Sequence, residues 1–233
     1  MEEINNMKIN IDFLDHFSPP KKISSGTLTN LNGEIVPYTI ELGLSKSSIY
    51  KCNEWRDFTT DFIIAFVDKN PNVFDYRIAL QEDIMLEDYN WDWSKKAFFY
   101  NTSEYNWFFL KTSDGIQSVC LTFHPRKSVL QNVDIFYIQY VASAPWNRKS
   151  SLYKRKYIGV GTEMMKQIQL FFVKTYHFNY GFSLHSLPQA QKFYEKIGMV
   201  NLPEYNDVNG LIFYEIDKEH AISFTEGKND RNR

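Results

Sequence analysis

Within residues 107–172 the hydrophobic pattern of the chain changes from strand-like to helix-like. Three strand-like apolar segments come first, at residues 107–113, 116–123 and 134–143. The Asp114-Gly115 dipeptide between the first two segments favours a tight hairpin turn. Farther along, Met164, Ile168 and Phe172 recur at four-residue steps, which is the spacing of one helix face. The pattern predicts an antiparallel meander followed by an amphipathic helix.

The amino-terminal part carries a second hairpin signal. Two strand-like runs, residues 25–31 and 35–42, flank the turn dipeptide Asn32-Gly33. Pro37 in the second run is typical of an edge strand, because proline has no N–H for a sheet ladder. After this hairpin, apolar residues at a spacing of three to four predict a helix over residues 53–67.

The carboxy-terminal part predicts a strand, a helix and a last strand. The strand at residues 180–185 leads into a helix with Ser186 as its expected N-cap and Gln189 as the capping-box partner. Gly198 stands where a helix of this length would stop. The last strand is expected at residues 211–216.

Length and composition indicate one large domain with short appendages. The chain has 233 residues, of which 43% are hydrophobic, and this is enough for a sizeable core. We expect an extension with the hairpin at residues 1–44, a main domain at residues 45–222 and a charged tail at residues 223–233.

Charge and hydropathy argue against several classes of partner. Lys and Arg total 26 against 28 Asp and Glu, so the net charge of -2 predicts no broad cationic face for nucleic acid. The apolar run at residues 62–67 is too short to span a bilayer, and no membrane partner is expected. Residues 1–6 are acidic and polar, unlike a secretory signal, so the expected location is cytoplasmic. Cys52 and Cys120 lack metal-ligand spacing, and no metal site is expected.

A Gly-x-Gly sequence and a basic loop precede the predicted helix at Met164. Gly159 and Gly161 would let an anion approach the backbone, and a helix start offers unpaired N–H groups and partial positive charge. The cations of the loop are Arg148, Lys149, Lys154, Arg155 and Lys156. This combination suits a polyphosphate, and a solvated surface loop would have the same composition. Met164 replaces the third glycine of a dinucleotide fingerprint, and the Walker Gly-Lys-Ser/Thr is absent, which argues against nicotinamide and nucleoside triphosphate chemistry.

Three motifs follow one another between residues 105 and 218. They are a strand ending in proline at residues 138–145, the sequence Lys156-Tyr157-Ile158-Gly159-Val160-Gly161, and residues 186–199 with Phe193-Tyr194 and Gly198. In this order they resemble the central strand, the pyrophosphate-binding Arg/Gln-x-x-Gly-x-Gly/Ala motif and the Asn-x-x-Ala-x-x-Phe-Tyr-x-Lys-x-Gly-Phe segment of the GNAT superfamily of N-acetyltransferases. The resemblance implies a GNAT-like α/β (α+β) fold, with a mixed, mostly antiparallel central sheet flanked by helices and an extra N-terminal β-hairpin.

The same resemblance implies an acyl-CoA-dependent N-acyltransferase with acetyl-CoA as cosubstrate and a primary amine that attacks the thioester directly. The strand at residues 180–185 would lie beside the central strand and splay apart from it, and pantetheine would lie in the gap. Backbone groups of Val141, Ala142 and Ser143 would hold the pantetheine and polarise the thioester carbonyl, as in an oxyanion hole. The other implied cofactor-binding residues are Arg148, Lys154, Arg155, Lys156, Ile158, Gly159, Val160, Gly161, Thr162, Ser186 and Gln189.

The sequence departs from the family pattern at three places. Lys156 stands where the family usually has Arg or Gln, and Ser186 replaces a frequent Asn that helps to hold pantetheine. The segment between Pro145 and Gly159 is longer than usual, so a longer loop over the cofactor is expected.

For the chemistry, the resemblance assigns Tyr194 as the general acid that protonates the departing CoA thiolate. Packing is the competing role for this residue. The central strand carries no outward carboxylate to serve as general base, and His185 is the candidate that replaces it. His124, Asp134 and ordered water are the remaining alternatives.

Two further hypotheses compete with the enzyme. One is a non-catalytic CoA- or partner-binding module on the same scaffold, motivated by the missing strand carboxylate. The other is a single-stranded RNA or sugar binder that stacks rings on aromatic side chains. The family resemblance also implies that residues 53–67 and 76–94 wall the acceptor side. Within the second segment, the acidic and aromatic residues 88–93 fit an acceptor site for a cationic amine through carboxylates and cation-π contacts, and they fit an ordinary aromatic core equally well.

Overall fold

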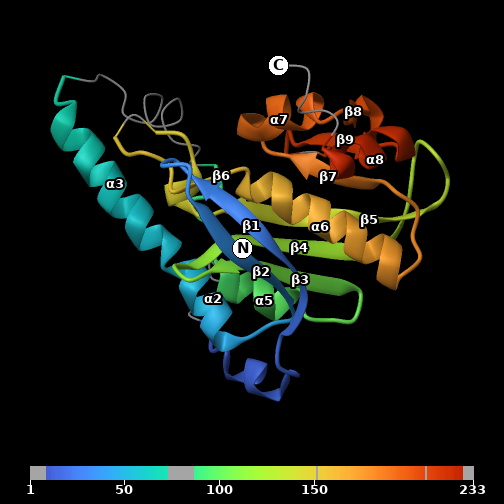
Figure 1. Cartoon of the computed structure of the whole chain (residues 1–233), viewed down its shortest axis with the longest axis horizontal. Coiled ribbons are helices and arrows are strands. Elements are labelled where there is room, and N and C mark those ends of the chain that lie inside the picture. Colours follow the sequence, from blue (N-terminus) through green and yellow to red (C-terminus); the bar gives the residue numbers. More distant parts are fainter. Residues whose placement is uncertain (1–8, 73–86, 151, 208, 228–233) are drawn as a thin grey trace.

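The computed structural model describes residues 9–72, 87–150, 152–207 and 209–227, and in this part of the chain the strands form one sheet (Figure 1). Nine strands follow one another across it in the order β6-β1-β2-β3-β4-β5-β7-β9-β8. Their bounds are Lys21–Asn30 (β1), Ile35–Leu42 (β2), Tyr105–Thr112 (β3), Gly115–Lys127 (β4), Asp134–Ser143 (β5), Tyr157–Ile158 (β6), Phe182–Ser186 (β7), Val200–Asn201 (β8) and Ile212–Ile216 (β9).

Neighbouring strands run antiparallel except for β5 and β7, which are parallel. The predicted hairpins form β1-β2 and β3-β4, with Gly33 (φ +83°) and Gly115 (φ +107°) in the left-handed backbone region that their turns require. The prediction that Pro37 marks an edge strand is wrong for β2 as a whole, because β2 lies between β1 and β3. Pro37 pairs with β1, however, and the pairing with β3 begins at Thr39, so the proline takes no place in that ladder.

Helices cover both faces of the sheet (Figure 1). Helices α6 (Val160–Thr175), α7 (Gln191–Lys196) and α8 (Lys218–Glu226) pack on one face, and α2 (Lys46–Asn53), the start of α3 (Trp55–Lys69) and α5 (Trp93–Phe99) pack on the other. Short 3-10 helices lie at Asp12–His16 (η1), Pro145–Asn147 (η2), Pro188–Ala190 (η3) and Pro203–Tyr205 (η4). The far end of α3 extends away from the sheet.

The two cores follow from the alternation of side chains along the central strands. On β3, Phe108 and Leu110 belong to the core under α6, whereas Trp107 and Phe109 belong to the core under α2 and α5. Both faces of this strand are therefore buried, which explains why its sequence reads as a nearly continuous apolar run. The ring of Phe172 on α6 stacks on Phe136 of β5 with the ring centroids 4.3 Å apart.

The structure confirms the predicted fold class, an α/β (α+β) arrangement with a mixed, mostly antiparallel sheet flanked by helices. The helix predicted over residues 53–67 is α3, and α2 precedes it directly. The hairpin predicted within residues 1–44 continues the central sheet through β2 and β3. The domain boundary at residue 44 stays a prediction, and the predicted tail lies partly outside the described residues.

The start of the second predicted helix differs from the expected capping box. Ser186 is the last residue of β7, and its hydroxyl donates to the Leu187 carbonyl instead of capping a helix. The 3-10 turn η3 intervenes before α7 begins at Gln191. Gly198 (φ +93°) does end the helix, as predicted.

Cys52 and Cys120 are both free and buried, so no disulfide links them. None of the described helices is long and apolar enough to cross a membrane. The part of the chain that the structure describes also contains no cluster of side chains that could hold a metal ion.

Candidate active site

The parallel strands β5 and β7 separate toward their carboxyl ends. Only residues 136–138 of β5 pair with β7 in the described chain, although β5 continues to Ser143. The Ala142 carbonyl accepts a hydrogen bond from Ser118 Oγ of β4 at 2.8 Å. Because backbone groups alternate in direction along a strand, the N–H and C=O of Val141 face the opening on the β7 side. The opening thus presents unpaired backbone groups of β5.

A cavity of about 100 Å³ occupies this opening, and we call it the strand-gap cavity. Its walls come from β5, β7, η3, α7 and the segment at residues 87–92. Six of the residues that line it are Asp88, Gln139, Val141, His185, Gln189 and Tyr194. Four predicted site residues therefore share one cavity: Val141 on β5, and His185, Gln189 and Tyr194 on the other side of the gap.

Helix α6 begins beside the end of β5. Gly159 precedes the helix in the left-handed conformation (φ +73°), which a side chain would disfavour. A Cβ atom added to Gly161 would lie 3.2 Å from Ser143 Oγ, so the first turn of the helix approaches the strand closely. The unpaired N–H groups of this turn, which includes Thr162, are the anion site that the sequence predicts.

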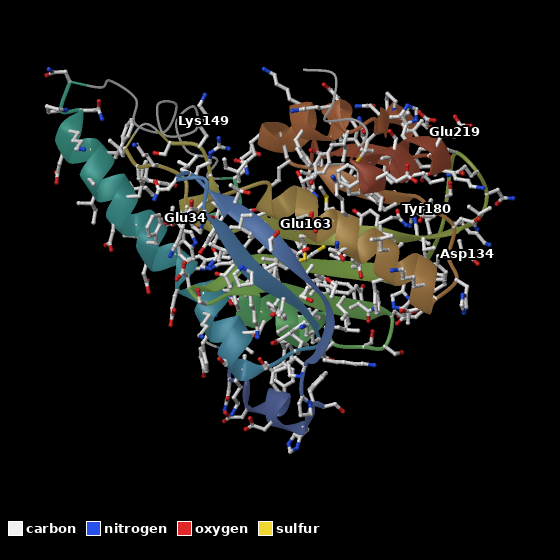
Figure 2. The ribbon with its side chains drawn as sticks, viewed as in Figure 1. Glu34, Asp134, Lys149, Glu163, Tyr180 and Glu219 are labelled. Carbon is white, nitrogen blue, oxygen red and sulfur yellow. The ribbon has the colours of Figure 1, made fainter. Side chains whose placement is uncertain are left out.

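The remaining predicted residues near this turn have structural contacts of their own. Val160 packs into the core under α6, and Ala142 packs into the core on the opposite face. Ile158 is exposed and pairs with Thr29 of β1, which joins the loop before α6 to the amino-terminal hairpin. Glu163, also in the first turn, accepts a hydrogen bond from the Tyr38 hydroxyl (Figure 2).

The cations of the basic loop divide into two groups. Arg148 makes a two-pronged ion pair with Asp88, at 2.7 and 2.6 Å, and also donates to the Ser143 carbonyl. Lys156 pairs with Asp114 at 2.9 Å. Lys154 and Arg155 are exposed and have no ion pair within the described residues. Of the predicted phosphate contacts, Lys154 and Arg155 are the side chains that a ligand can recruit without breaking a pair.

Tyr194 lies on α7 at the wall of the strand-gap cavity. Its side chain is only 6% exposed and contacts the rings of Phe193 and Tyr214. Its hydroxyl has no hydrogen-bond partner among the described residues. Burial raises the pKa of Tyr194 above its usual value of 10, so the phenol keeps its proton at neutral pH. The geometry is compatible both with packing and with proton donation into the cavity.

His185 also lines the cavity, but both of its ring nitrogens are engaged. Nε2 lies 2.9 Å from the Tyr205 carbonyl, which can only accept, so Nε2 carries the proton. Nδ1 of the neutral ring then accepts from the Tyr137 hydroxyl at 2.7 Å. In this arrangement the ring has no lone pair left for a substrate. The role of His185 as general base stays a prediction.

The structure does not bring His124 and Asp134 to this cavity. His124 packs against Tyr176, just beyond the last turn of α6, whereas the first turn of α6 lies beside the end of β5 that lines the cavity. Asp134 is the first residue of β5 and pairs with Lys127 at 2.7 Å. Both residues therefore lie at the opposite end of these elements from Val141 and Gly161.

Residues 87–92 belong to the segment expected on the acceptor side, and Asp88 and Trp91 line the strand-gap cavity. The contacts that hold this segment in place were not predicted. Two hydrogen bonds join Gln189 of η3 to Glu87. The Gln189 backbone N–H donates to the Glu87 carboxylate at 3.1 Å, and the Glu87 backbone N–H donates to the side-chain oxygen of Gln189 at 3.3 Å. Asp88 is held by Arg148, and the side chains of this pair are 8% and 14% exposed. Residues 87 and 88 are thereby fixed across the opening between β5 and β7. Most of the predicted acceptor segment before them, residues 76–86, lies outside the described residues.

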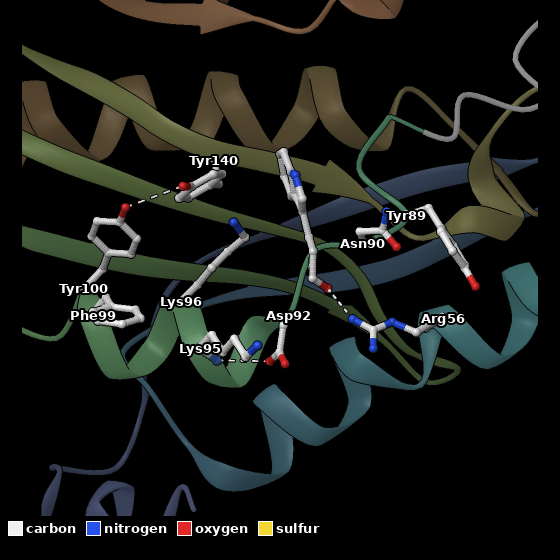
Figure 3. A pocket seen from close by; sticks show the side chains of 10 residues that line it. Arg56, Tyr89, Asn90, Asp92, Lys95, Lys96, Phe99, Tyr100 and Tyr140 are labelled. Atoms are coloured by element: carbon white, nitrogen blue, oxygen red, sulfur yellow. Dashed lines mark hydrogen bonds between the residues drawn. The ribbon is translucent and has the colours of Figure 1, made fainter. Parts of the chain in front are cut away.

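A larger pocket of about 650 Å³ lies next to the strand-gap cavity, between α3, α5 and β5 (Figure 3). We call it the aromatic pocket. Trp91 and Tyr140 line both cavities, and their ring centroids are 4.9 Å apart. Trp93, in contrast, is 3% exposed and belongs to the core under α2 and α5. Residues 88–93 thus contribute the rings of Tyr89 and Trp91 to the pocket and the ring of Trp93 to the core.

Comparisons with known proteins give likenesses of fold. No protein-family model matches the chain, and no curated protein sequence matches it. The N-acetyltransferase PseH of Campylobacter jejuni is 14% identical, with a TM-score of 0.41 over 77% of this chain and 98% of that one. A PaiA N-acetyltransferase from Thermoplasma acidophilum in complex with coenzyme A is 11% identical, with a TM-score of 0.44 over 76% and 97%. An uncharacterized protein from Bacillus halodurans is 9% identical, with a TM-score of 0.49 over 90% and 97%.

Proposed function

We propose that this protein is an acyl-CoA-dependent N-acyltransferase that transfers acetyl from acetyl-CoA to a primary amine. The observation that carries the proposal is the meeting of two features at one place. Strand β5 parts from β7 at Val141, and α6 begins beside Ser143 with Gly161 in its first turn. Backbone donors for a pyrophosphate and an opening for a narrow thioester arm are therefore adjacent.

In the proposed complex the pyrophosphate binds the N–H groups at the start of α6, with Lys154 and Arg155 as cationic partners. The pantetheine lies in the strand-gap cavity along Val141. The N–H of Val141 is then a donor for the thioester oxygen, on which negative charge develops during attack. No step requires the carbonyl of Ser143, which Arg148 already occupies.

The proposed reaction is a direct displacement. The nitrogen of the neutral amine attacks the thioester carbonyl, the carbon–sulfur bond breaks, and the CoA thiolate leaves with a proton from the Tyr194 hydroxyl. The amine proton passes to solvent. A water molecule then returns a proton to the Tyr194 phenolate and restores the phenol. Asp88 lines the strand-gap cavity, and its two carboxylate oxygens accept from Arg148 but keep further lone pairs that can accept a hydrogen bond from the incoming amine.

One observation favours the alternative of a non-catalytic CoA-binding module. Both ring nitrogens of His185 are bonded, no carboxylate stands on the cavity side of β5, and Asp88 is paired with Arg148. The described part of the site therefore lacks an evident side-chain base. The enzyme proposal depends on water to remove the amine proton, whereas a module needs no base. The two readings make the same prediction for CoA binding and different predictions for turnover.

Calorimetric titration tests the binding half of the proposal. We expect CoA to bind the protein at one site, because the start of α6 offers backbone donors for one pyrophosphate. We expect a single-stranded RNA oligonucleotide of similar total charge to bind at least tenfold more weakly, because the net charge of the chain is -2 and provides no broad cationic face. Tight RNA binding without CoA binding would contradict the proposal and favour the RNA-binding hypothesis.

A further inference from the structure

The side chains that line the aromatic pocket are mostly cationic, whereas the sequence of residues 88–93 suggests an acidic site. Among the described residues that line it, Arg56, Lys95 and Lys96 are cationic and Asp92 is the one carboxylate. That carboxylate is the N-cap of α5 and accepts from the Lys95 backbone N–H at 3.0 Å. The electrostatic balance of the pocket walls is therefore positive (Figure 3).

Lys96 already occupies the aromatic faces that a cationic acceptor would use. Its Nζ lies 3.4 Å from the centroid of the Tyr140 ring and 4.7 Å from that of Trp91. A second ammonium on these rings would meet the charge of Lys96 at close range. Burial lowers the pKa of Lys96 to about 8, and an anion beside it would favour the charged form.

Arg56 supplies a second group for an anion from the α3 side of the pocket. Its guanidinium makes one long hydrogen bond, 3.5 Å, to the Trp91 carbonyl and is otherwise exposed. A guanidinium carries five N–H donors in a planar fork that matches a carboxylate or a phosphate. The bond to Trp91 leaves most of these donors for a ligand.

The pocket is connected to the proposed reaction centre by shared walls. Trp91 and Tyr140 belong to both cavities, and Asp88 lines the strand-gap cavity beyond them. A ligand that spans the two cavities would meet Arg56 and Lys96 at one end. At the other end it would meet Asp88, whose charge Arg148 balances but whose remaining lone pairs can accept a hydrogen bond from an amine. A volume of about 650 Å³ lies within the usual range for small-molecule pockets.

We propose that the aromatic pocket binds the acceptor substrate, and that this acceptor is a small molecule with an anionic group, contacted by Arg56 and Lys96, at the end opposite its reactive amine. This inference rests on the proposed acyltransferase function and names its substrate class. The body of the acceptor packs on Trp91 and Tyr140, and its amine points past these rings toward Asp88.

The test uses three probes that share a ring and a primary amine: benzylamine, para-(aminomethyl)benzoate and para-(aminomethyl)phenyl phosphate. Each is titrated calorimetrically into the protein, with and without saturating CoA. We expect at least one anionic probe to bind about tenfold or more tightly than benzylamine, because charge-assisted hydrogen bonds supply the difference. The anionic probe that binds more tightly shows whether the pocket prefers a carboxylate or a phosphate.

The variants are Arg56→Gln and Lys96→Met, each of which should reduce the preference for the anionic probe to about threefold or less. Lys174→Gln is the control, since Lys174 is an exposed cation in the last turn of α6, and it should keep the full preference. CoA titration of each variant checks that it is folded. If Arg56→Gln proves unstable, Lys96→Met still tests the proposal, because methionine keeps an apolar side chain against the rings of Trp91 and Tyr140.

The inference is overturned if benzylamine binds as tightly as both anionic probes, if none of the three binds, or if the preference persists in both variants. With CoA binding intact, these outcomes reject the acceptor class alone. Absence of CoA binding by the parent protein would instead reject the proposed function.

Discussion

Replacing Tyr194 with Phe is expected to lower kcat by about 100- to 10,000-fold, the usual contribution of a general acid, while CoA affinity changes little. The substitution removes the hydroxyl and keeps the ring that contacts Phe193 and Tyr214. The hydroxyl lines the strand-gap cavity side of α7 and has no partner among the described residues, so its loss leaves no other polar group unsatisfied. Packing should therefore survive the change.

The measurement is steady-state release of CoA thiol from acetyl-CoA, with thermal unfolding as the check on packing. Tyr214→Phe is the matched control, because it removes another hydroxyl from the same core cluster, one that donates to Glu195 outside the cavity. We expect its turnover to stay close to that of the parent. Unchanged turnover in Tyr194→Phe would assign Tyr194 to packing.

The raised pKa of Tyr194 adds a pH dependence to this prediction. A phenol whose pKa lies above 10 stays protonated through neutral and mildly alkaline pH. The donor form is therefore fully present below about pH 9, and it would be lost only as the pH rises through the raised pKa. We expect no alkaline fall of kcat from this residue below about pH 9.

Gly161→Val is expected to weaken CoA binding by about 100-fold. The valine side chain would stand in the first turn of α6, where a phosphate must approach the backbone N–H groups, and its Cβ would be 3.2 Å from Ser143 Oγ. Each charge-assisted hydrogen bond is worth about 1.5–3 kcal/mol, which corresponds to about 10- to 150-fold in affinity. Loss of one or two such bonds gives the expected effect.

Thr175→Val provides the control for helix propensity, since it introduces the same residue at the exposed other end of α6. This variant should bind CoA as the parent does. The phosphate assignment would be wrong if Gly161→Val, folded by circular dichroism and thermal unfolding, bound CoA with parental affinity.

Local patterns predicted the elements that position the proposed donor site. The Asp114-Gly115 turn and the four-residue spacing from Met164 to Phe172 are short-range signals, and the structure confirms the hairpin β3-β4 and helix α6. The family resemblance then predicted that the strand at residues 180–185 lies beside the central strand. Pairing of β5 with β7 bears this out, and periodicity alone would not have indicated it, because the two strands are separated by α6.

Charge patterns gave the positions of cations but not their partners. Arg148 and Lys156 were predicted to contact phosphate, yet their carboxylates, Asp88 and Asp114, come from 60 and 42 residues away in the chain. A buried ion pair of this kind depends on how distant loops meet, and composition contains no signal for it. Ser186 shows the same limit at short range. Its hydroxyl donates to the Leu187 carbonyl and therefore does not cap a helix.

The acceptor side was the least predictable part of the site. Residues 88–93 fit both an amine site and an aromatic core, and the structure divides them: Trp91 lines the pocket, whereas Trp93 is buried. The cation over Tyr140 is Lys96 of α5, five residues after Trp91 and on a different element from Tyr140. Which charge reaches an aromatic face is decided by the packing of α5 on β5, and it makes the described walls of the pocket cationic where the sequence suggested an acidic site.

Acetyl transfer itself tests the central claim most directly. The measurement combines acetyl-CoA with a panel of primary amines, the anionic probes included, and follows CoA thiol release together with the mass of the amide product. The account predicts amide and thiol in equal amounts for at least one amine, at a rate that the Tyr194→Phe variant loses. Binding of acetyl-CoA with no amide formed from any amine, at any pH between about 7 and 9, would contradict the account and leave a CoA-binding module in its place.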